Sequence, residues 1–329
     1  MNYLVSGHAS AQDFEATAKR VGITAAIVCA AEKLPSVLAS VSFLPSGRVF
    51  AVEELAKPMP AGAQPPPVLS DADNLLWRIG FSSGTTGGPK AIGWTHKVSL
   101  LNSGQLQAMY PAGPGERMLI AMGSETLFAS YHWLGMLHSG GCSIFPQSKP
   151  DAIMSAISRH QPSSVLTSSY AASVLAEIAT RTMPGEHRVT PPSLKMIAVG
   201  GGKMAVEQQR VLRERFAPEL IDCYGSSEAC FLARGPSELK IKAPQYVGRL
   251  TPWAEGEAVD ENDKPLPPGT VGRLRFRNMA MADGYLGDEA ATAKYFKNGW
   301  FYPGDLGMVT IQGLLALGGA RTISSTSVG

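Results

Sequence analysis

Short apolar runs alternate with amphipathic segments through the middle of the chain, and this alternation limits the fold more than any other feature. The candidate strands lie at residues 117–121, 142–145, 164–167 and 194–199. The candidate helices lie at residues 97–110, 127–139, 150–160, 170–182 and 204–216, and the first of them is expected to carry Leu100, Leu101 and Leu106 on its apolar, buried side. Strands and helices in this order form a mostly parallel sheet layered with helices. The sequence therefore predicts an α/β fold.

Residues 81–96 read FSSGTTGGPKAIGWTH, a polar, glycine-rich turn between two apolar runs of strand character. Such a turn is hairpin-like. Glycines let backbone N–H groups approach an anion, hydroxyls add donors, and Lys90 adds a positive charge. No Lys-Ser or Lys-Thr pair is present, so this is not the P-loop G-x-x-x-x-G-K-[ST]. An ordinary surface turn is the alternative, but the density of donors favours a polyphosphate ligand.

Two further stretches follow the strand candidates. Gly200, Gly201 and Gly202 come directly after the strand at residues 194–199. Ligands of parallel sheets bind beyond the carboxyl ends of the strands, so this turn can pass under a flat ring, although a tight strand-to-helix turn explains it equally well. The stretch DCYGSSEAC then offers Tyr224, whose ring can stack on a purine, and Glu228, a carboxylate of the kind that holds Mg²⁺.

The segment SSGTTGGPK resembles, almost letter for letter, the phosphate-binding signature of the AMP-binding, or adenylate-forming (ANL), superfamily. This superfamily includes acyl-CoA synthetases, luciferases and the adenylation domains of peptide synthetases. Residues 224–228 match its pattern of an aromatic residue, glycine, any residue, serine or threonine, and glutamate. The stretch GWFYPGDLG is similar to its Thr-Gly-Asp motif, with Pro303 in place of threonine. The resemblance covers residues 13–321, with the motifs in the family's order.

The resemblance implies roles for individual residues. Asp305 is expected to accept both ribose hydroxyls, Asp222 to accept from the adenine amino group, and Arg321 to contact ribose or phosphate. Lys90, Thr86, Ser227 and Glu228 are expected to act in catalysis, with Glu228 also holding Mg²⁺. The expected nucleotide-binding residues are Ser82, Ser83, Gly84, Thr85, Thr86, Gly87, Lys90, Gly200, Gly201, Gly202, Asp222, Cys223, Tyr224, Gly225, Ser226, Ser227, Asp305 and Arg321.

The reaction that the resemblance implies has two steps. A carboxylate attacks the α-phosphate of ATP to give an acyl-adenylate and pyrophosphate, and a thiol, normally that of coenzyme A, then takes the acyl group. The protein contributes positioning and charge neutralisation. The alternatives are a nucleotide-binding module or inactive fragment, and the core of a ligase that forms an amide or loads a carrier protein.

The acid is expected to be a plain carboxylic acid. Peptide-synthetase adenylation domains place an aspartate where this chain has Leu127, and that aspartate binds an α-amino group. Candidate walls of the acyl pocket are the Gly200 turn, Phe128, Tyr131, His132 and Trp133. For Tyr131 and Trp133, ordinary helix core is an equally good explanation.

Composition narrows the partners. A net charge of +2 argues against a nucleic-acid partner held by bulk electrostatics. No run of about 18 apolar residues exists, so no membrane span is expected. The 4 cysteines form no C-x-x-C pair, which favours reduced thiols in a cytoplasmic protein.

Four segments are expected along the chain. Residues 1–70 form a shortened N-terminal segment with a proline-rich connector, and residues 71–246 form the α/β nucleotide-binding subdomain. Residues 247–321 alternate in short runs broken by proline and glycine, which predicts a smaller antiparallel β subdomain. Residues 322–329 are expected to be an unstructured tail. The family's C-terminal domain, with its catalytic lysine, is expected to be absent, and turnover by this chain is expected to be slow.

Overall fold

The computed structural model describes residues 2–3, 15, 18–28, 42–51, 53, 57–58, 62–64, 67, 70–82, 90–110, 112–124, 126–147, 149–182 and 189–318. The chain divides into two compact units. One is Met1–His96 with Tyr285–Glu289, and the other is Lys97–Gly284 with Ala290–Gly329. Within the described ranges, no helix combines the length and the apolar character that crossing a membrane requires.

The first unit contains an antiparallel hairpin, β4 (Leu76–Ser82) and β5 (Lys90–Thr95), on either side of residues 83–89. Ser82 is the register partner of Lys90, so the two apolar runs that flank the glycine-rich turn pair as the sequence predicts. The unit's other elements are β1 (Asn2–Tyr3), which pairs in parallel with β4, β2 (Ala26–Val28) with β3 (Val49–Ala51), and the 3-10 turns η2 (Ser46–Arg48) and η3 (Ala72–Asn74).

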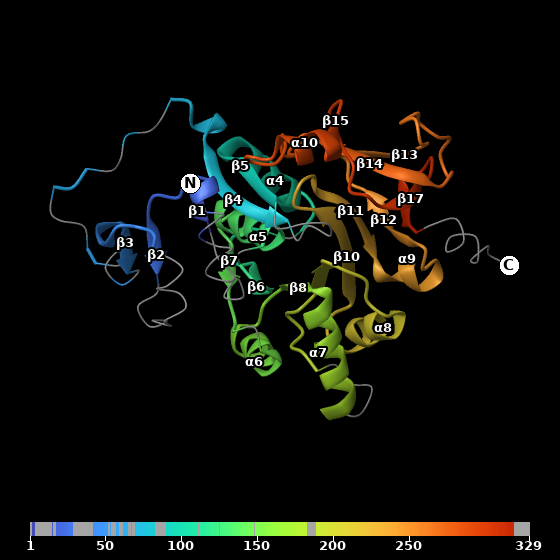
Figure 1. Ribbon diagram of the computed structural model, residues 1–329. Helices are drawn as coiled ribbons and strands as arrows, with labels where there is room; N and C mark the ends of the chain where they lie inside the picture. The colour runs from blue at the N-terminus through green and yellow to red at the C-terminus, as the bar shows by residue number, and fades with distance from the viewer. Residues whose placement is uncertain are drawn as a thin grey trace. The chain divides into compact units, whose positions relative to one another are not determined.

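The second unit is built on a 13-stranded mixed sheet (Figure 1). The strands follow one another in the order β15-β16-β14-β17-β18-β12-β11-β10-β9-β8-β6-β7, and β13 pairs with β14. From β7 to β10 every neighbouring pair is parallel, and from β10 to β15 every pair is antiparallel. The predicted α/β fold, with a parallel part followed by antiparallel strands, is confirmed.

The elements of this unit agree closely with the sequence periodicity. The strands are β6 (Arg117–Ala121), β7 (Cys142–Ile144), β8 (Ser164–Ser168), β9 (Met196–Gly200), β10 (Glu219–Ser226), β11 (Cys230–Pro236), β12 (Tyr246–Leu250), β13 (Ala254–Val259), β14 (Gly272–Asn278), β15 (Phe296–Lys297), β16 (Trp300–Phe301), β17 (Leu306–Val309) and β18 (Leu314–Leu317). The helices are α4 (His96–Gln107, whose first residue belongs to the first unit), α5 (Leu127–His138), α6 (Pro150–His160), α7 (Ser169–Thr182), α8 (Val206–Arg215), α9 (Ser237–Lys242) and α10 (Glu289–Tyr295).

The central parallel strands β6, β8 and β9 are buried on both faces because helices cover both. Successive side chains of a strand point to opposite faces. On β6, Leu119 packs in a core with residues of α6, α7 and α8, whereas Met118 and Ile120 pack with residues of α4 and α5. The alternation repeats on β8, where Val165 faces the first core and Leu166 the second. This arrangement explains why these strands are continuous apolar runs.

One helix differs from expectation in what it buries. The expectation that Leu100 lies on the buried side of its helix is wrong, because its side chain is 51% exposed. The buried residues of α4 are mostly polar, namely Ser99, Asn102, Ser103, Gln105 and Leu106. These polar side chains can face the interior because several of them find hydrogen-bond partners on other segments, as Asn102 and Gln105 do.

Most of the DCYGSSE stretch lies on a strand. Residues 222–226 belong to β10, and only residues 227–229 form the turn to β11. At the predicted boundary at residue 247, β12 pairs with β11 on one side and with β18 on the other. Strands from both sides of that boundary therefore share one sheet, and the division into four segments stays a prediction.

Candidate functional site

The glycine turn after β9 has little room for larger side chains. A Cβ on Gly200 would lie 2.9 Å from Cε1 of Phe128, and one on Gly202 would lie 2.8 Å from Oγ of Ser169. Gly201 has a φ of +86°, which residues with a side chain rarely adopt. Gly200 and Gly202 therefore suit the close approach to side chains of α5 and α7, whereas Gly201 suits its backbone conformation.

The glycine turn and the DCYGSSE stretch come together at the carboxyl ends of two parallel strands. Gly200 is the register partner of Cys223, and Val199 that of Asp222. Both predicted segments thus meet at the edge of the sheet where such folds bind ligands. The pairing of β9 with β10 is what unites them.

Gly225 is required by the tight hairpin of β10 and β11. A Cβ at this position would run into the backbone carbonyl of Cys230, and the register shifts between Tyr224 and Gly225. Oγ of Ser226 accepts a hydrogen bond from the backbone N–H of Ala229 at 3.0 Å, which closes the turn. The glycine of the motif therefore has a structural reason that is independent of any ligand.

Tyr224 and Asp305, which are 81 residues apart in sequence, are in direct contact. The hydroxyl of Tyr224 donates to Oδ2 of Asp305 at 2.6 Å, and the ring of Tyr224 lies 5.8 Å from that of Phe276. Burial, together with the charge of Asp305 and the hydrogen bond to it, raises the pKa of Tyr224 well above its usual range, so the hydroxyl stays protonated. Two residues that were singled out from separate motifs are therefore brought together.

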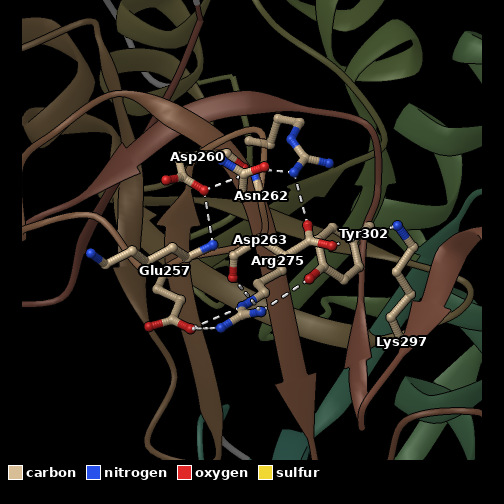
Figure 2. A network of polar contacts seen from close by, with 9 residues as sticks. Glu257, Asp260, Asn262, Asp263, Arg275, Lys297 and Tyr302 are labelled. Carbon is tan, nitrogen blue, oxygen red and sulfur yellow. Dashed lines mark hydrogen bonds and ion pairs between the residues drawn. The ribbon is translucent and has the colours of Figure 1, made fainter.

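A network of polar contacts holds the segment that precedes Asp305 (Figure 2). Arg275 on β14 contacts Glu257 on β13 with its Nη2 at 2.5 Å, and its Nη1 donates to the hydroxyl of Tyr302 at 3.0 Å. The backbone N–H of Leu274 donates to the carbonyl of Asp305 at 2.9 Å. The strand pair β13 and β14 thus fixes residues 302–305 through side-chain and main-chain bonds.

The side-chain amides of two buried asparagines hold the turn that carries Glu228. Nδ2 of Asn278 donates to the carbonyls of Ala229 and Phe231 at 3.3 and 3.4 Å. Nδ2 of Asn102 lies 3.0 Å from Sγ of Cys230, whose thiol donates to the carbonyl of Ala280 at 3.1 Å. Sequence reasoning missed Asn102 and Asn278. The signal in the sequence that could have found Asn102 is the run of polar residues on α4.

Glu228 itself has a buried side chain, and its carbonyl accepts the backbone N–H of Ala282 at 2.8 Å. No group of three or more histidine, cysteine, aspartate and glutamate side chains in the described ranges is arranged to hold a metal ion. Mg²⁺ is commonly held by one or two carboxylates together with substrate phosphates, so a single glutamate fits the predicted role. The donor set is therefore compatible with a magnesium ion that arrives with a nucleotide.

The aromatic residues of α5 divide into two groups. Tyr131 is buried in the core, with its hydroxyl 3.6 Å from Sγ of Cys230, in agreement with the core explanation. Phe128 is half-buried and packs against Gly200, whereas His132 is buried one helical turn further on.

Burial raises the pKa of both Cys223 and Cys230 to about 12, so these thiols stay protonated.

In the first unit, Lys90 begins β5, and its ammonium group lies 5.7 Å from the centre of the Tyr285 ring. Tyr285 is buried, forms a bridge with Ile92, and is followed by Leu286, whose N–H donates to Ala91 at 2.7 Å. Ser82 ends β4. The other residues predicted for the phosphate loop, Ser83, Gly84, Thr85, Thr86 and Gly87, and the predicted Arg321 lie outside the described residues.

Comparison with known proteins agrees with these motifs. A salicyl-AMP ligase / salicyl-S-ArCP synthetase of Mycobacterium tuberculosis is 30% identical over 252 residues, which are 74% of this chain and 43% of that protein. A 3-hydroxybenzoate–CoA/4-hydroxybenzoate–CoA ligase of Thauera aromatica is 27% identical over 234 residues, 69% of this chain and 43% of that protein. The chain thus spans less than half the length of these curated relatives.

Solved structures share the fold. The amide bond synthetase McbA from Marinactinospora thermotolerans superposes with a TM-score of 0.82 at 23% identity, over 95% of this chain and 63% of that one. The O-succinylbenzoate coenzyme A synthetase (MenE) from Bacillus subtilis, in complex with ATP and magnesium ion, gives 0.81 at 18% identity, over 97% and 64%. The sequence pattern of the AMP-binding enzymes matches residues 5–286. The chain belongs to the AMP-binding enzymes, the adenylate-forming superfamily.

Proposed function

We propose that the protein binds ATP with Mg²⁺ and activates a carboxylic acid as its acyl-adenylate. The observation that carries the proposal is the contact of Tyr224 with Asp305. Membership of the family supports it, because the family's members are adenylate-forming enzymes. The carboxyl ends of β9 and β10, where the glycine turn adjoins the DCYGSSE stretch, would receive the adenosine part of the nucleotide.

The proposed step conserves atoms and charge. A carboxylate oxygen of the acid forms a bond to the α-phosphorus of ATP, and the bond from that phosphorus to the bridging oxygen of pyrophosphate breaks. The acid is its own nucleophile, so no activated serine or cysteine is required. The protein would hold the reactants in line and stabilise the charge that develops on phosphorus, which are the main sources of rate in phosphoryl-type transfers.

Individual roles follow from the chemistry of each side chain. The carboxylate of Asp305 can accept the two ribose hydroxyls, because one oxygen bonded to Tyr224 leaves further lone pairs. Glu228 would bind Mg²⁺, which neutralises phosphate charge when it is present. Asp222, half-buried beside the glycine turn, would accept from the adenine amino group. For Lys90 and the loop at residues 83–89, phosphate binding stays a prediction.

The acceptor of the acyl group is proposed to be the thiol of coenzyme A. Several of the relatives are coenzyme A ligases, including the hydroxybenzoate ligase of Thauera aromatica. The salicyl-AMP ligase / salicyl-S-ArCP synthetase and the amide bond synthetase favour a second candidate, in which the acceptor is a carrier-protein thiol or an amine.

The proposal is tested by exchange of labelled pyrophosphate into ATP, with a panel of carboxylic acids and Mg²⁺. Acid-dependent exchange that is lost in the Asp305→Ala variant supports the reaction. Glu177→Gln, which changes an exposed acid on α7, is the matched control and should leave exchange unchanged. Exchange that needs no acid, or that survives in the Asp305 variant, contradicts the proposal. Product assays with coenzyme A and with amines then separate the two acceptors.

A further inference from the structure

His132 is held in one tautomer by its own helix. Its Nδ1 lies 2.7 Å from the carbonyl oxygen of Phe128, four residues earlier on α5. A carbonyl oxygen accepts only, so Nδ1 carries the hydrogen and donates it. In the neutral imidazole, Nε2 then carries a lone pair and is an acceptor. Burial lowers the pKa of His132 to about 4, which keeps the ring neutral at ordinary pH.

The Nε2 acceptor has no donor. The side chain is 2% exposed, and Nε2 is buried with no hydrogen-bond partner in the part of the chain that the structure describes. Buried polar atoms in native proteins are nearly always paired, because an unpaired one loses its bond to water without a replacement. An exception next to a candidate ligand site therefore requires an explanation.

Aromatic rings pack against the imidazole ring of His132. The ring of Phe128 meets that of His132 edge-on at 4.6 Å and 72°, and the ring of Tyr110 lies 5.1 Å away. Phe231 lies 6.2 Å from Phe128 and 6.4 Å from Tyr110. The hydroxyl of Tyr110 is already engaged with Sγ of Cys223 at 3.1 Å. A flat, apolar ligand body fits such surroundings, because aromatic rings pack well in offset or edge-on contact.

Phe128 joins this group to the candidate site. It packs against Gly200, at the carboxyl end of β9, and it is half-buried, whereas Tyr110 and Phe231 are buried. Phe128 is therefore the ring of this group that can turn aside. Its movement would open the His132 ring to a ligand bound beside the glycine turn.

We propose that Nε2 of His132 accepts a hydrogen bond from a hydroxyl or amino group on the ring of an aromatic carboxylic acid, and so selects the acid that the site activates. This inference rests on the proposed function, because it makes the acid the occupant of the group. An unsubstituted aliphatic acid offers no donor, and an anionic substituent would face the lone pair of Nε2. A ring-bound donor satisfies the acceptor, and the ring that carries it can pack against the displaced Phe128.

The test compares the binding of benzoate with that of the three hydroxybenzoates and the three aminobenzoates. Calorimetry uses the whole chain with Mg²⁺ and α,β-methylene-ATP, which cannot release pyrophosphate. At least one substituted acid is expected to bind tenfold or more tightly than benzoate, a difference of about 1.4 kcal/mol. Equal binding of all the acids, or binding of none, overturns the inference.

The matched variant is His132→Phe, which keeps a ring of similar shape and removes both nitrogens. The preference for the substituted acid should vanish, while the affinity for benzoate stays within threefold. The unfolding midpoint without ligand should stay or rise, because an unpaired buried acceptor is removed. A variant that keeps the preference contradicts the inference. A fall in stability with no change in preference assigns His132 to the core alone.

Nuclear magnetic resonance of ¹⁵N-histidine gives a second readout that does not depend on the variant's affinity. The Nε2 resonance of His132, identified by its loss in His132→Phe, should move when the preferred acid binds and stay in place with benzoate. If the nucleotide binds but no acid moves the Nε2 resonance, this inference fails and the proposed function stands. Failure to bind the nucleotide, with no change in the Asp305→Ala variant, defeats the proposed function.

Discussion

Replacing Tyr224 by phenylalanine removes one oxygen atom, the donor to Asp305. Hydrogen bonds to charged groups contribute about 1.5–3 kcal/mol to stability. Both side chains are half-buried, so water can partly replace the lost bond, and the lower end of that range applies. We expect the Tyr224→Phe variant to lose about 1.5 kcal/mol of unfolding free energy.

A double-mutant cycle with Asp305→Ala isolates this contact. If the hydroxyl acts through Asp305, the double variant is less destabilised than the sum of the single variants, by about 1–1.5 kcal/mol. Urea unfolding, followed by circular dichroism, measures each free energy. Mg²⁺-ATP affinity, measured on the same four proteins, should show coupling of the same sign, because Tyr224 orients the carboxylate that binds ribose.

A control cycle pairs Tyr224→Phe with Glu207→Gln, an exposed acid on α8. These two changes should add within about 0.5 kcal/mol. Additivity in the Tyr224–Asp305 cycle itself, in stability and in affinity alike, would refute the reasoning, because the hydrogen bond would then carry no energy.

Three further predictions follow from the packing. Gly225→Ala should destabilise the fold by about 2 kcal/mol or more in urea unfolding, because its Cβ runs into the Cys230 carbonyl, whereas the control Gly104→Ala, with open space on helix α4, should not destabilise. Asn278→Leu should lower the unfolding free energy by about 2–4 kcal/mol, because it leaves buried carbonyls unpaired. It should weaken ATP binding more in the presence of Mg²⁺ than in its absence. An equal loss of ATP affinity with and without Mg²⁺ contradicts a role for Asn278 in placing Glu228. Between pH 6.5 and pH 4 the unfolded chain binds a proton at His132 that the folded chain does not, so the unfolding free energy decreases as the pH is lowered. By pH 4.5 this decrease should be about 2–3 kcal/mol larger than the decrease in the His132→Phe variant. Equal pH profiles of the two proteins contradict the assignment.

The parallel part of the fold was predictable because it depends on local periodicity. Strands buried on both faces are continuous apolar runs, and the helices between them repeat every three to four residues. The strands β6, β8 and β9 and the helix α6 begin and end within two residues of their expected positions. Pro150 marks the start of α6, and Gly200 marks the end of β9.

The inward face of α4 was not predictable from its own sequence. Its partners, Ala280, Asn278 and Cys230, come from distant segments, and a helix cannot reveal which polar residues will find partners after folding. For the same reason the sequence alone does not indicate that β10 extends through residues 222–226. Tyr224 and Gly225 lie on a strand because β9 and β11 pair with it, although the sequence there is typical of a turn.

The candidate site shows the same division between local and long-range information. The motifs identified Gly200, Tyr224 and Asp305 individually, since each residue type suits its proposed role. That the hydroxyl of Tyr224 donates to Asp305 depends on a sheet that joins residues 81 positions apart. The unpaired Nε2 of His132 was also invisible in the sequence, where His132 was one of several candidate pocket walls.

The most direct test of the account is a calorimetric titration of the chain with ATP and Mg²⁺, alongside Asp305→Ala and the control Glu177→Gln. The account predicts that the unmodified chain and the control bind alike, and that Asp305→Ala binds at least tenfold more weakly, a loss of about 1.4 kcal/mol or more for the bonds to ribose. Equal binding by all three proteins, or binding by none, would contradict the claim that this is an adenylate site.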